Sequence, residues 1–216
     1  MTGPLFADTT TAPGLLVTVD GPNGSGKSTL IDAVQDVLGH ELDVHCTRQP
    51  SPTALGELIR SSERRYQGRA LACLVAGDRH QQLVLEILPR LREGALVLCD
   101  RYVESSLVLQ RMDGVPTEDI LAINRGIVRP DLRIRLLADA SVLSERLAAR
   151  AADAARRFEQ MPGGPERELA LYEEADRFLT REQRLPATVY DTSHTNARGL
   201  AKEMSKVIYA SLDGPL

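Results

Sequence analysis

One glycine-rich segment carries the residue types that bind the phosphates of a nucleotide. Residues 21–28 read Gly-Pro-Asn-Gly-Ser-Gly-Lys-Ser and fit the pattern G-x-x-x-x-G-K-[ST] at every fixed position. Glycines let the backbone curl so that its N–H groups face one concavity, which suits phosphate oxygens. In such loops the lysine, here Lys27, reaches the β- and γ-phosphates, and the hydroxyl of the next residue, here Ser28, ligates Mg²⁺. The segment therefore predicts binding of nucleotide phosphates with Mg²⁺, although it does not by itself choose among a kinase, a GTPase and an ATPase.

The use of lysine also draws attention to this loop. Lys27 is the only lysine before Lys202, although the chain has 26 basic residues. A chance glycine turn before a helix is the alternative interpretation, but a β-rich run precedes the loop and a helical pattern follows it, as the motif requires. The nucleotide-binding residues that we predict are Gly21, Asn23, Gly24, Ser25, Gly26, Lys27, Ser28 and Thr29.

Two further segments place an arginine directly after a predicted strand. Arg48 lies in Thr-Arg-Gln-Pro at residues 47–50, and Arg101 lies in Asp-Arg-Tyr at residues 100–102. The carboxyl ends of parallel strands meet at one edge of a sheet, so both arginines are expected beside the phosphate loop. Two guanidinium groups at this edge suit a second anion besides ATP. A kinase is therefore favoured over a hydrolase, whose attacking water carries no phosphate.

In their order along the chain, these motifs resemble those of the thymidylate kinase family. The family's phosphate loop, Thr-Arg-Glu-Pro, Asp-Arg-x-x-Gln, Asp-Arg-Tyr with paired serines, and Pro-Asp-Leu correspond to residues 21–28, 47–50, 78–82, 100–106 and 130–132. The resemblance covers roughly residues 15–160 and continues more weakly to the C-terminus. It implies a P-loop kinase fold, the reaction of dTMP and ATP to dTDP and ADP, a role in nucleotide biosynthesis, and a homodimer.

The resemblance also implies roles for individual residues. Arg101 would hold the transferring phosphoryl group and the acceptor phosphate, Arg48 would grip the acceptor phosphate, and Arg79 would donate to a carbonyl of the base. Asp100 would support Mg²⁺ or its water shell. A phosphate monoester has a second pKa near 6 and is already a dianion at pH 7, so a general base is not needed.

The last arginines that we expect in the site belong to a lid at about residues 150–165. Residues 156–159 look like the family's Asp-Arg-Ile-Glu pattern, and Ser25 occupies the loop position where some relatives carry an arginine, so a lid arginine would supply the transition-state charge. The predicted catalytic residues are Lys27, Asp100, Arg101, Arg150 and Arg157, and the predicted metal ligands are Ser28 and Asp100. The predicted substrate-binding residues are Arg48, Val75, Arg79, Arg101, Tyr102, Ser105, Leu109 and Gln110.

Each of these roles has a structural alternative. Asp100 and Arg101 could form an ion pair at a strand end, Arg48 could cap a helix, and Arg79 or a lid arginine could lie on a solvated helix face. Asp20, which ends the first predicted strand, suits either a site near the metal or a turn.

Several positions depart from the family pattern, and most of them lie on the acceptor side. Val75 stands where a phenylalanine usually stacks on thymine, and Leu109 stands where a tyrosine helps some members to exclude a ribose 2′-hydroxyl. Asn23 and Gln49 replace acidic residues. Three functions are therefore compared: dTMP kinase, the same transfer to a modified pyrimidine nucleotide or a specialised-metabolite phosphate, and a non-catalytic nucleotide sensor or ATPase.

The elements that must position these residues alternate between strand and helix. Apolar runs predict strands at residues 15–19, 42–47, 95–99, 132–136 and 187–190. Helical spacing is found at residues 28–38, 53–60, 69–92, from 105 onward, 117–128, 141–150, 166–183 and 197–212, with Pro89 placed to kink the long third helix. The pattern predicts an α/β fold with a five-stranded parallel sheet. We expect a flexible tail at residues 1–13 and a single domain at residues 14–216.

Composition excludes several other classes of protein. The chain has 216 residues, 43% of them hydrophobic and 26% charged, and a net charge of −4, which argues against a coat for DNA or RNA. Three cysteines are too few and too scattered for a disulfide scaffold or a zinc cluster. No apolar run approaches the length of a membrane span, and a basic signal-peptide start is missing. We therefore expect a cytoplasmic protein.

Overall fold

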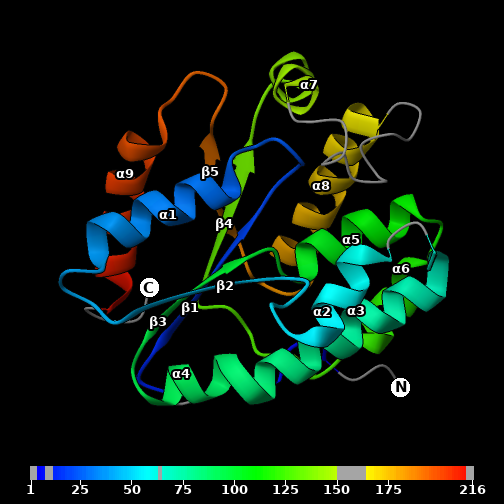
Figure 1. Cartoon of the computed structure of the whole chain (residues 1–216), viewed down its shortest axis with the longest axis horizontal. Coiled ribbons are helices and arrows are strands. Elements are labelled where there is room, and N and C mark those ends of the chain that lie inside the picture. The colour runs from blue at the N-terminus through cyan, green and yellow to red at the C-terminus, as the bar shows by residue number, and fades with distance from the viewer. Residues whose placement is uncertain (1–3, 8–11, 63–64, 150–163, 213–216) are drawn as a thin grey trace.

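Five short strands, most of them rich in apolar residues, pair in parallel to form the central sheet (Figure 1). They are β1 (Leu15–Asp20), β2 (Val44–Arg48), β3 (Leu96–Asp100), β4 (Leu132–Leu137) and β5 (Ala187–Asp191), in the spatial order β2-β3-β1-β4-β5. The computed structural model describes residues 4–7, 12–62, 65–149 and 164–212. The parallel sheet of five strands confirms the fold expected from the alternation of strands and helices.

Helices cover both faces of this sheet (Figure 1). They are α1 (Lys27–Leu38), α2 (Ala54–Ser61), α3 (Gly68–Gln82), the π-helix η1 (Leu83–Ile87), α4 (Leu88–Arg92), α5 (Val103–Met112), α6 (Thr117–Ile123), α7 (Ala140–Ala148), α8 (Gly164–Arg181) and α9 (Ala197–Leu212). Successive strand residues point to opposite faces, so Leu15 and Val17 pack beneath α1 and α9, whereas Leu16 packs beneath α3, α5 and α8.

The helix predicted at residues 69–92 is interrupted. It consists of α3, η1 and α4, with Pro89 in the first turn of α4. Proline has no backbone N–H and its ring crowds the carbonyl four residues earlier, and the wider π-turn ends just before it. Val84 and Leu85 on this turn are 63% and 65% exposed. The sequence therefore located the break but not its form.

The prediction of a flexible tail at residues 1–13 is wrong for residues 4–7, which pack against the rest of the protein. Leu5 and Phe6 are buried, and the Ala7 N–H donates to the Ile127 carbonyl oxygen at 2.8 Å. The guanidinium of Arg129 lies 5.6 Å from the centre of the Phe6 ring. The helix predicted at residues 117–128 ends at Ile123 instead: Gly126 has a φ of +77°, outside helical geometry, and Ile127 forms a parallel bridge with Phe6.

The carboxyl ends of the central strands share one edge of the sheet. Val19 of β1 lies beside Asp100 of β3, and Asp100 lies beside Arg48 of β2. The segment after β1 therefore starts next to the predicted acidic and basic residues. Within the described ranges, we find no helix whose length and apolar character would let it cross a membrane.

Candidate active site

The loop between β1 and α1 needs glycine for reasons of both space and backbone angle. Gly24 and Gly26 have φ values of +86°, in the left-handed region that side chains disfavour. A Cβ atom on Gly21 would lie 2.6 Å from the Leu136 carbonyl oxygen. No described side chain caps the start of α1, so its first N–H groups face the loop, as an anion site at a helix N-terminus requires.

Lys27 folds back over this loop. Its Nζ donates to the carbonyl oxygens of Gly21 and Pro22, both at 2.8 Å. Burial, and next the positive charge of Arg101, lower the pKa of Lys27 from 10.5 to about 7. Since an anion would favour the charged ammonium, phosphate binding and protonation of Lys27 are coupled.

Ser28 and Asp100, the two predicted metal ligands, are in direct contact. The Ser28 hydroxyl donates to Asp100 Oδ2 at 2.6 Å. Asp100 Oδ1 is buried and has no hydrogen-bond partner among the described residues. A hydroxyl and a carboxylate beside a phosphate site suit Mg²⁺, which completes its shell with water and phosphate oxygens. No group of three or more His, Cys, Asp or Glu side chains suited to a metal occurs in the part of the chain that the structure describes.

Arg101 lies at the junction of two cavities. Its φ is +72°, rare for a residue with a side chain, and the strain points to a functional position. One cavity, of about 120 Å³, follows the phosphate loop and is lined by Lys27 and Asp100, and the other, of about 50 Å³, lies between α3 and α5. Arg101 and Asn23 line both cavities, and Arg101 Nη2 donates to Asn23 Oδ1 at 2.7 Å.

The smaller cavity gathers most of the predicted substrate-binding residues. Seven of the eight line it: Val75, Arg79, Arg101, Tyr102, Ser105, Leu109 and Gln110. Arg48 does not; its side chain is exposed at the end of β2. Ile59 and Leu71 complete an aliphatic wall that sequence reasoning missed, because single leucines and isoleucines on helices carry no functional signal.

Arg79 is almost entirely buried in the wall of this cavity. Its Nε donates to Gln49 Oε1 at 2.7 Å and its Nη2 donates to Ser106 Oγ at 2.7 Å. Asn124 Oδ1 and the Tyr102 carbonyl oxygen accept the other hydrogen bonds. Arg79 therefore fixes two polar residues of the cavity wall, which excludes the solvated helix face as its environment.

Six of the eight predicted nucleotide-binding residues line the cavity beside the phosphate loop, and two do not. Asn23, Gly24, Gly26, Lys27, Ser28 and Thr29 line the loop cavity. Ser25 faces a third cavity of about 350 Å³, where Arg146 and Thr192 contribute, and Gly21 lines none of these three cavities. Arg146 Nη2 donates to the Thr192 carbonyl oxygen at 2.7 Å. The predicted lid arginines Arg150 and Arg157 lie outside the described residues.

Two residues of α8 reach the site without a sequence signal. Glu168 Oε1 accepts the Asn23 backbone N–H at 3.1 Å, and the Tyr172 hydroxyl lies 3.4 Å from Arg101 Nη1 and 3.1 Å from Ser105 Oγ. Glu168 and Tyr172 are four residues apart and share a face of the helix. Pairs separated by 145 and 71 residues cannot be recognised from local patterns.

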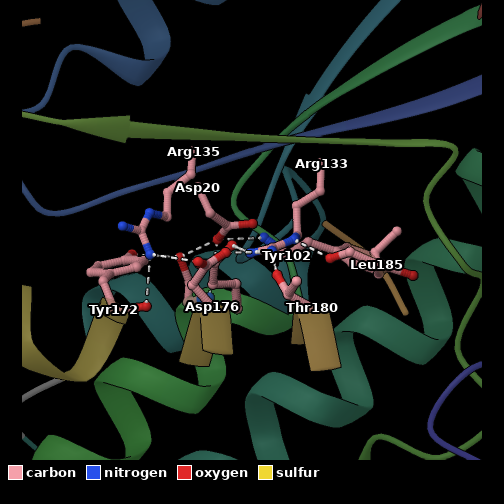
Figure 2. A network of polar contacts seen from close by, with 10 residues as sticks. Asp20, Tyr102, Arg133, Arg135, Tyr172, Asp176, Thr180 and Leu185 are labelled. Atoms are coloured by element: carbon pink, nitrogen blue, oxygen red, sulfur yellow. Dashed lines mark hydrogen bonds and ion pairs between the residues drawn. The ribbon is translucent and has the colours of Figure 1, made fainter. Parts of the chain in front are cut away.

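A buried polar network ties α8 to the sheet. Arg133 and Arg135 extend from β4 toward α8, as Figure 2 shows, and both approach Asp176. Arg133 also pairs with Glu104 of α5 at 2.7 Å. Burial raises the pKa of Glu104 to about 8, although Arg133 opposes the shift. These contacts fix the position of α8 relative to the sheet.

Comparison with known sequences gives one result. A family model described as thymidylate kinase matches residues 19–180. The thymidylate kinase of Shouchella clausii is 38% identical over 157 residues, which are 68% of this chain and 74% of that protein. The thymidylate kinase of Halalkalibacterium halodurans is 38% identical over 144 residues, which are 62% of this chain and 69% of that protein.

Comparison with solved structures shows the same fold. The thymidylate kinase of Candida albicans has a TM-score of 0.72 and 20% identity, with 94% of each chain covered. That of Ehrlichia chaffeensis has a TM-score of 0.66 and 20% identity, with 91% of this chain and 98% of the other covered.

Proposed function

The chain belongs to the thymidylate kinase family, and on this premise we propose that it transfers the terminal phosphoryl group of ATP to dTMP. It is a phosphotransferase of nucleotide biosynthesis, and the products are dTDP and ADP. The observation that carries the assignment to this site is the wall shared by its two cavities. Arg101 and Asn23 line both the phosphate-loop cavity and the cavity between α3 and α5. Donor and acceptor phosphates on either side of this wall would meet at one buried guanidinium.

The residues present suit a reaction between two anions. The acceptor phosphate is a dianion near pH 7, so the protein must align it with the donor and offset their repulsion. Lys27 would stabilise the donor phosphates and Arg101 the transferring group. A dianionic acceptor can attack the transferring phosphoryl group without a general base.

We propose ATP as the donor and Mg²⁺ as the metal. Ser28 and Asp100 would hold the ion, which when bound neutralises charge on the phosphates. The buried Asp100 Oδ1 supports this role, since it has no other hydrogen-bond partner among the described residues. Arg150 and Arg157 stay as proposed donors of transition-state charge, because Ser25 stands where a loop arginine would otherwise supply it.

For the acceptor, the aliphatic wall replaces an aromatic one. Val75, Leu71 and Leu109 offer apolar contact to a pyrimidine ring, while Arg79 and Gln110 lie beside them as polar groups. Arg48, exposed at the end of β2, is proposed to reach the acceptor phosphate from outside the cavity. Lys27, Ser28, Asp100 and Arg101 are assembled together, which argues against a sensor without turnover, and no feature of the described part of the site favours another acceptor.

We further propose a cytoplasmic homodimer. Val84 and Leu85 expose large apolar side chains side by side on η1, a feature typical of a surface that another subunit covers. The three cysteines are free thiols, as suits a reducing compartment. Replacing Leu85 by Glu should shift the molar mass in light scattering from dimer to monomer. A parent that is already a monomer at micromolar concentration would contradict the dimer.

The deciding experiment measures ADP formation and product mass with ATP, Mg²⁺ and each of dTMP, dUMP, UMP, dCMP and CMP. We expect dTMP to be the best acceptor. We also expect Arg48→Ala to raise the KM for dTMP more than the KM for ATP. A reaction without acceptor is the control for hydrolysis. ADP formation that does not depend on any acceptor would instead identify an ATPase, and nucleotide binding without ADP formation would identify a sensor.

A further inference from the structure

A chain of hydrogen bonds leads from the sheet to the Arg101 guanidinium. Asp20 Oδ1 accepts from the Ser105 hydroxyl at 2.6 Å and from the backbone N–H groups of Ser105 and Tyr102 at 3.0 and 3.1 Å. Ser105 Oγ lies 3.1 Å from the Tyr172 hydroxyl, and Arg101 Nη1 donates to both oxygens, at 3.1 and 3.4 Å. Both oxygens therefore touch the same guanidinium nitrogen.

The direction of this chain follows from the number of protons available. Ser105 has one hydroxyl proton, and Asp20 Oδ1 accepts it. Ser105 Oγ can then only accept from its other two neighbours, so the Tyr172 hydroxyl donates to Ser105 and accepts from Arg101. Burial raises the pKa of Tyr172 well above 10 and keeps this donor protonated. A phenyl ring at position 172 could fill the space but could not complete the chain.

The backbone of Tyr172 is itself held in place. Arg135 Nη1 donates to the Tyr172 carbonyl oxygen at 3.1 Å and lies 3.4 Å from Asp176 Oδ2 (Figure 2). One turn earlier on the helix, Glu168 accepts from the Asn23 backbone N–H and, at 3.4 Å, from the Asn23 side-chain amide. Helix α8 thus contacts Asn23 and Arg101, the two residues that line both cavities.

We propose that Tyr172 is a positioning residue for phosphoryl transfer, holding the Arg101 guanidinium at the junction of the donor and acceptor cavities through its hydroxyl group. The role rests on the proposed function of Arg101. It assigns to α8 a part in catalysis that does not depend on the arginines of the lid.

The primary test is Tyr172→Phe, which removes one oxygen atom from a buried ring. We expect kcat/KM for dTMP to fall about tenfold, with KM for ATP within about twofold of the parent, because Lys27 and the phosphate loop are unaffected. Tyr209→Phe is the matched control. This change likewise removes a tyrosine hydroxyl that has a hydrogen-bond partner, here Glu41, but at a partly exposed position that lines neither cavity, and it should leave both constants unchanged.

A double-mutant cycle separates positioning from general support of the fold. In an Arg101→Lys background the guanidinium is absent, so Tyr172→Phe should change kcat/KM by less than about twofold. A further tenfold loss in that background would show that Tyr172 acts independently of Arg101 and would overturn the proposal. If Tyr172→Phe does not fold, Ser105→Ala interrupts the same chain with the ring in place and enters the same cycle.

A second measurement does not depend on the reaction. In the nucleotide-free parent, hindered rotation should give separate Arg101 guanidinium signals in ¹⁵N nuclear magnetic resonance spectra. These signals should merge in Tyr172→Phe and stay separate in Tyr209→Phe, and unchanged signals in Tyr172→Phe would refute the positioning role. A parent that ignores dTMP while Tyr172→Phe alters the Arg101 signals would instead contradict only the proposed function.

Discussion

Two groups of buried arginines in this molecule are held in different ways. Arg79 and Arg101, beside the acceptor cavity, donate to hydroxyl, amide and carbonyl oxygens, and no ion pair joins either to a carboxylate among the described residues. Arg133 and Arg135 extend from β4 to a carboxylate that they share, Asp176. Neutral acceptors fix a guanidinium without cancelling its charge, so the first group stays available to an anion. The second group is instead paired with a carboxylate inside the fold.

The pKa values in the first group follow from the same contrast. Burial lowers the pKa of Arg79, whose direct partners are neutral. Burial also opposes the charge of Arg101, but Tyr172, Asp100 and Glu168 lie close enough to raise its pKa overall. The surroundings of Arg101 thus favour its charged form, although no ion pair joins it to a carboxylate among the described residues. A residue that binds phosphate requires this combination.

The largest effect that we expect comes from Arg101→Lys. An amine keeps the charge but cannot bridge Asn23, Ser105 and an anion together, so kcat should fall about 10²- to 10³-fold, or about 3–4 kcal/mol of transition-state stabilisation. The melting temperature should stay within a few degrees of the parent. A sharp loss of thermal stability in Arg101→Lys, with kcat per folded molecule equal to that of the parent, would contradict the contrast between the two groups.

In the second group, Asp176→Asn should act on stability instead. It leaves two buried guanidinium groups with one carboxyl partner, Glu104, and should lower the free energy of unfolding by about 2 kcal/mol, less than for a fully buried pair because Asp176 is 27% exposed. Urea denaturation measures this loss. Asp119→Asn is the control: its partner Arg69 is 70% exposed, and the change should be under about 0.5 kcal/mol. Equal losses in both variants would mean that the buried network has no special weight.

These two groups also show what could be predicted from the sequence. The phosphate loop and the Asp100-Arg101 pair were predictable, because each is a short motif at the end of an apolar strand. Arg133 and Arg135 alternate with Leu132, Ile134 and Leu136, a pattern that usually marks one solvated face. Their carboxylate Asp176 is 43 residues from Arg133 in the chain, so their burial could not be foreseen.

Helix α8 illustrates the same limit. The helical spacing of α8 was visible in the sequence. The contacts of Glu168 and Tyr172 with the site could not be predicted, because they depend on where the helix crosses the carboxyl edge of the sheet. The contact of residues 4–7 with Ile127 was missed for a related reason, since two apolar residues are too few to predict a packed segment.

Lys27, on the donor side, is a further buried cation available to an anion, and its charge depends on pH. With a pKa of about 7 in the free protein, it is mostly neutral at pH 8, and bound triphosphate should restore its proton. Affinity for ATP should therefore be flat below pH 7 and fall above it by up to about tenfold per pH unit. Calorimetry at pH 8 in buffers of different ionisation enthalpy should show proton uptake. Lys27→Arg, charged throughout, should bind ATP with no change in proton number, and uptake in that variant would assign the proton to another group.

The smallest effect should come from Glu104→Gln. Because burial raises the pKa of this carboxyl from 4.5 to about 8, the group is mostly protonated at pH 7, and an amide should cost under about 1 kcal/mol. A raised carboxyl pKa favours the folded state at low pH, so the parent should lose stability relative to the variant as pH rises from about 5 to 8. Urea denaturation at pH 5 and pH 9 checks the sign. A parent that gains on the variant toward pH 9 would show that the ion pair with Arg133 outweighs desolvation.

The wall formed by Asn23 and Arg101 has a consequence for inhibitor design. One molecule with a nucleoside at each end of a polyphosphate can occupy the cavities on both sides of this wall, its linker passing the guanidinium. Once one end is bound, binding of the other is intramolecular and is governed by effective concentration, which linker length controls. The number of phosphates in the linker is therefore the variable to optimise, before either nucleoside is changed.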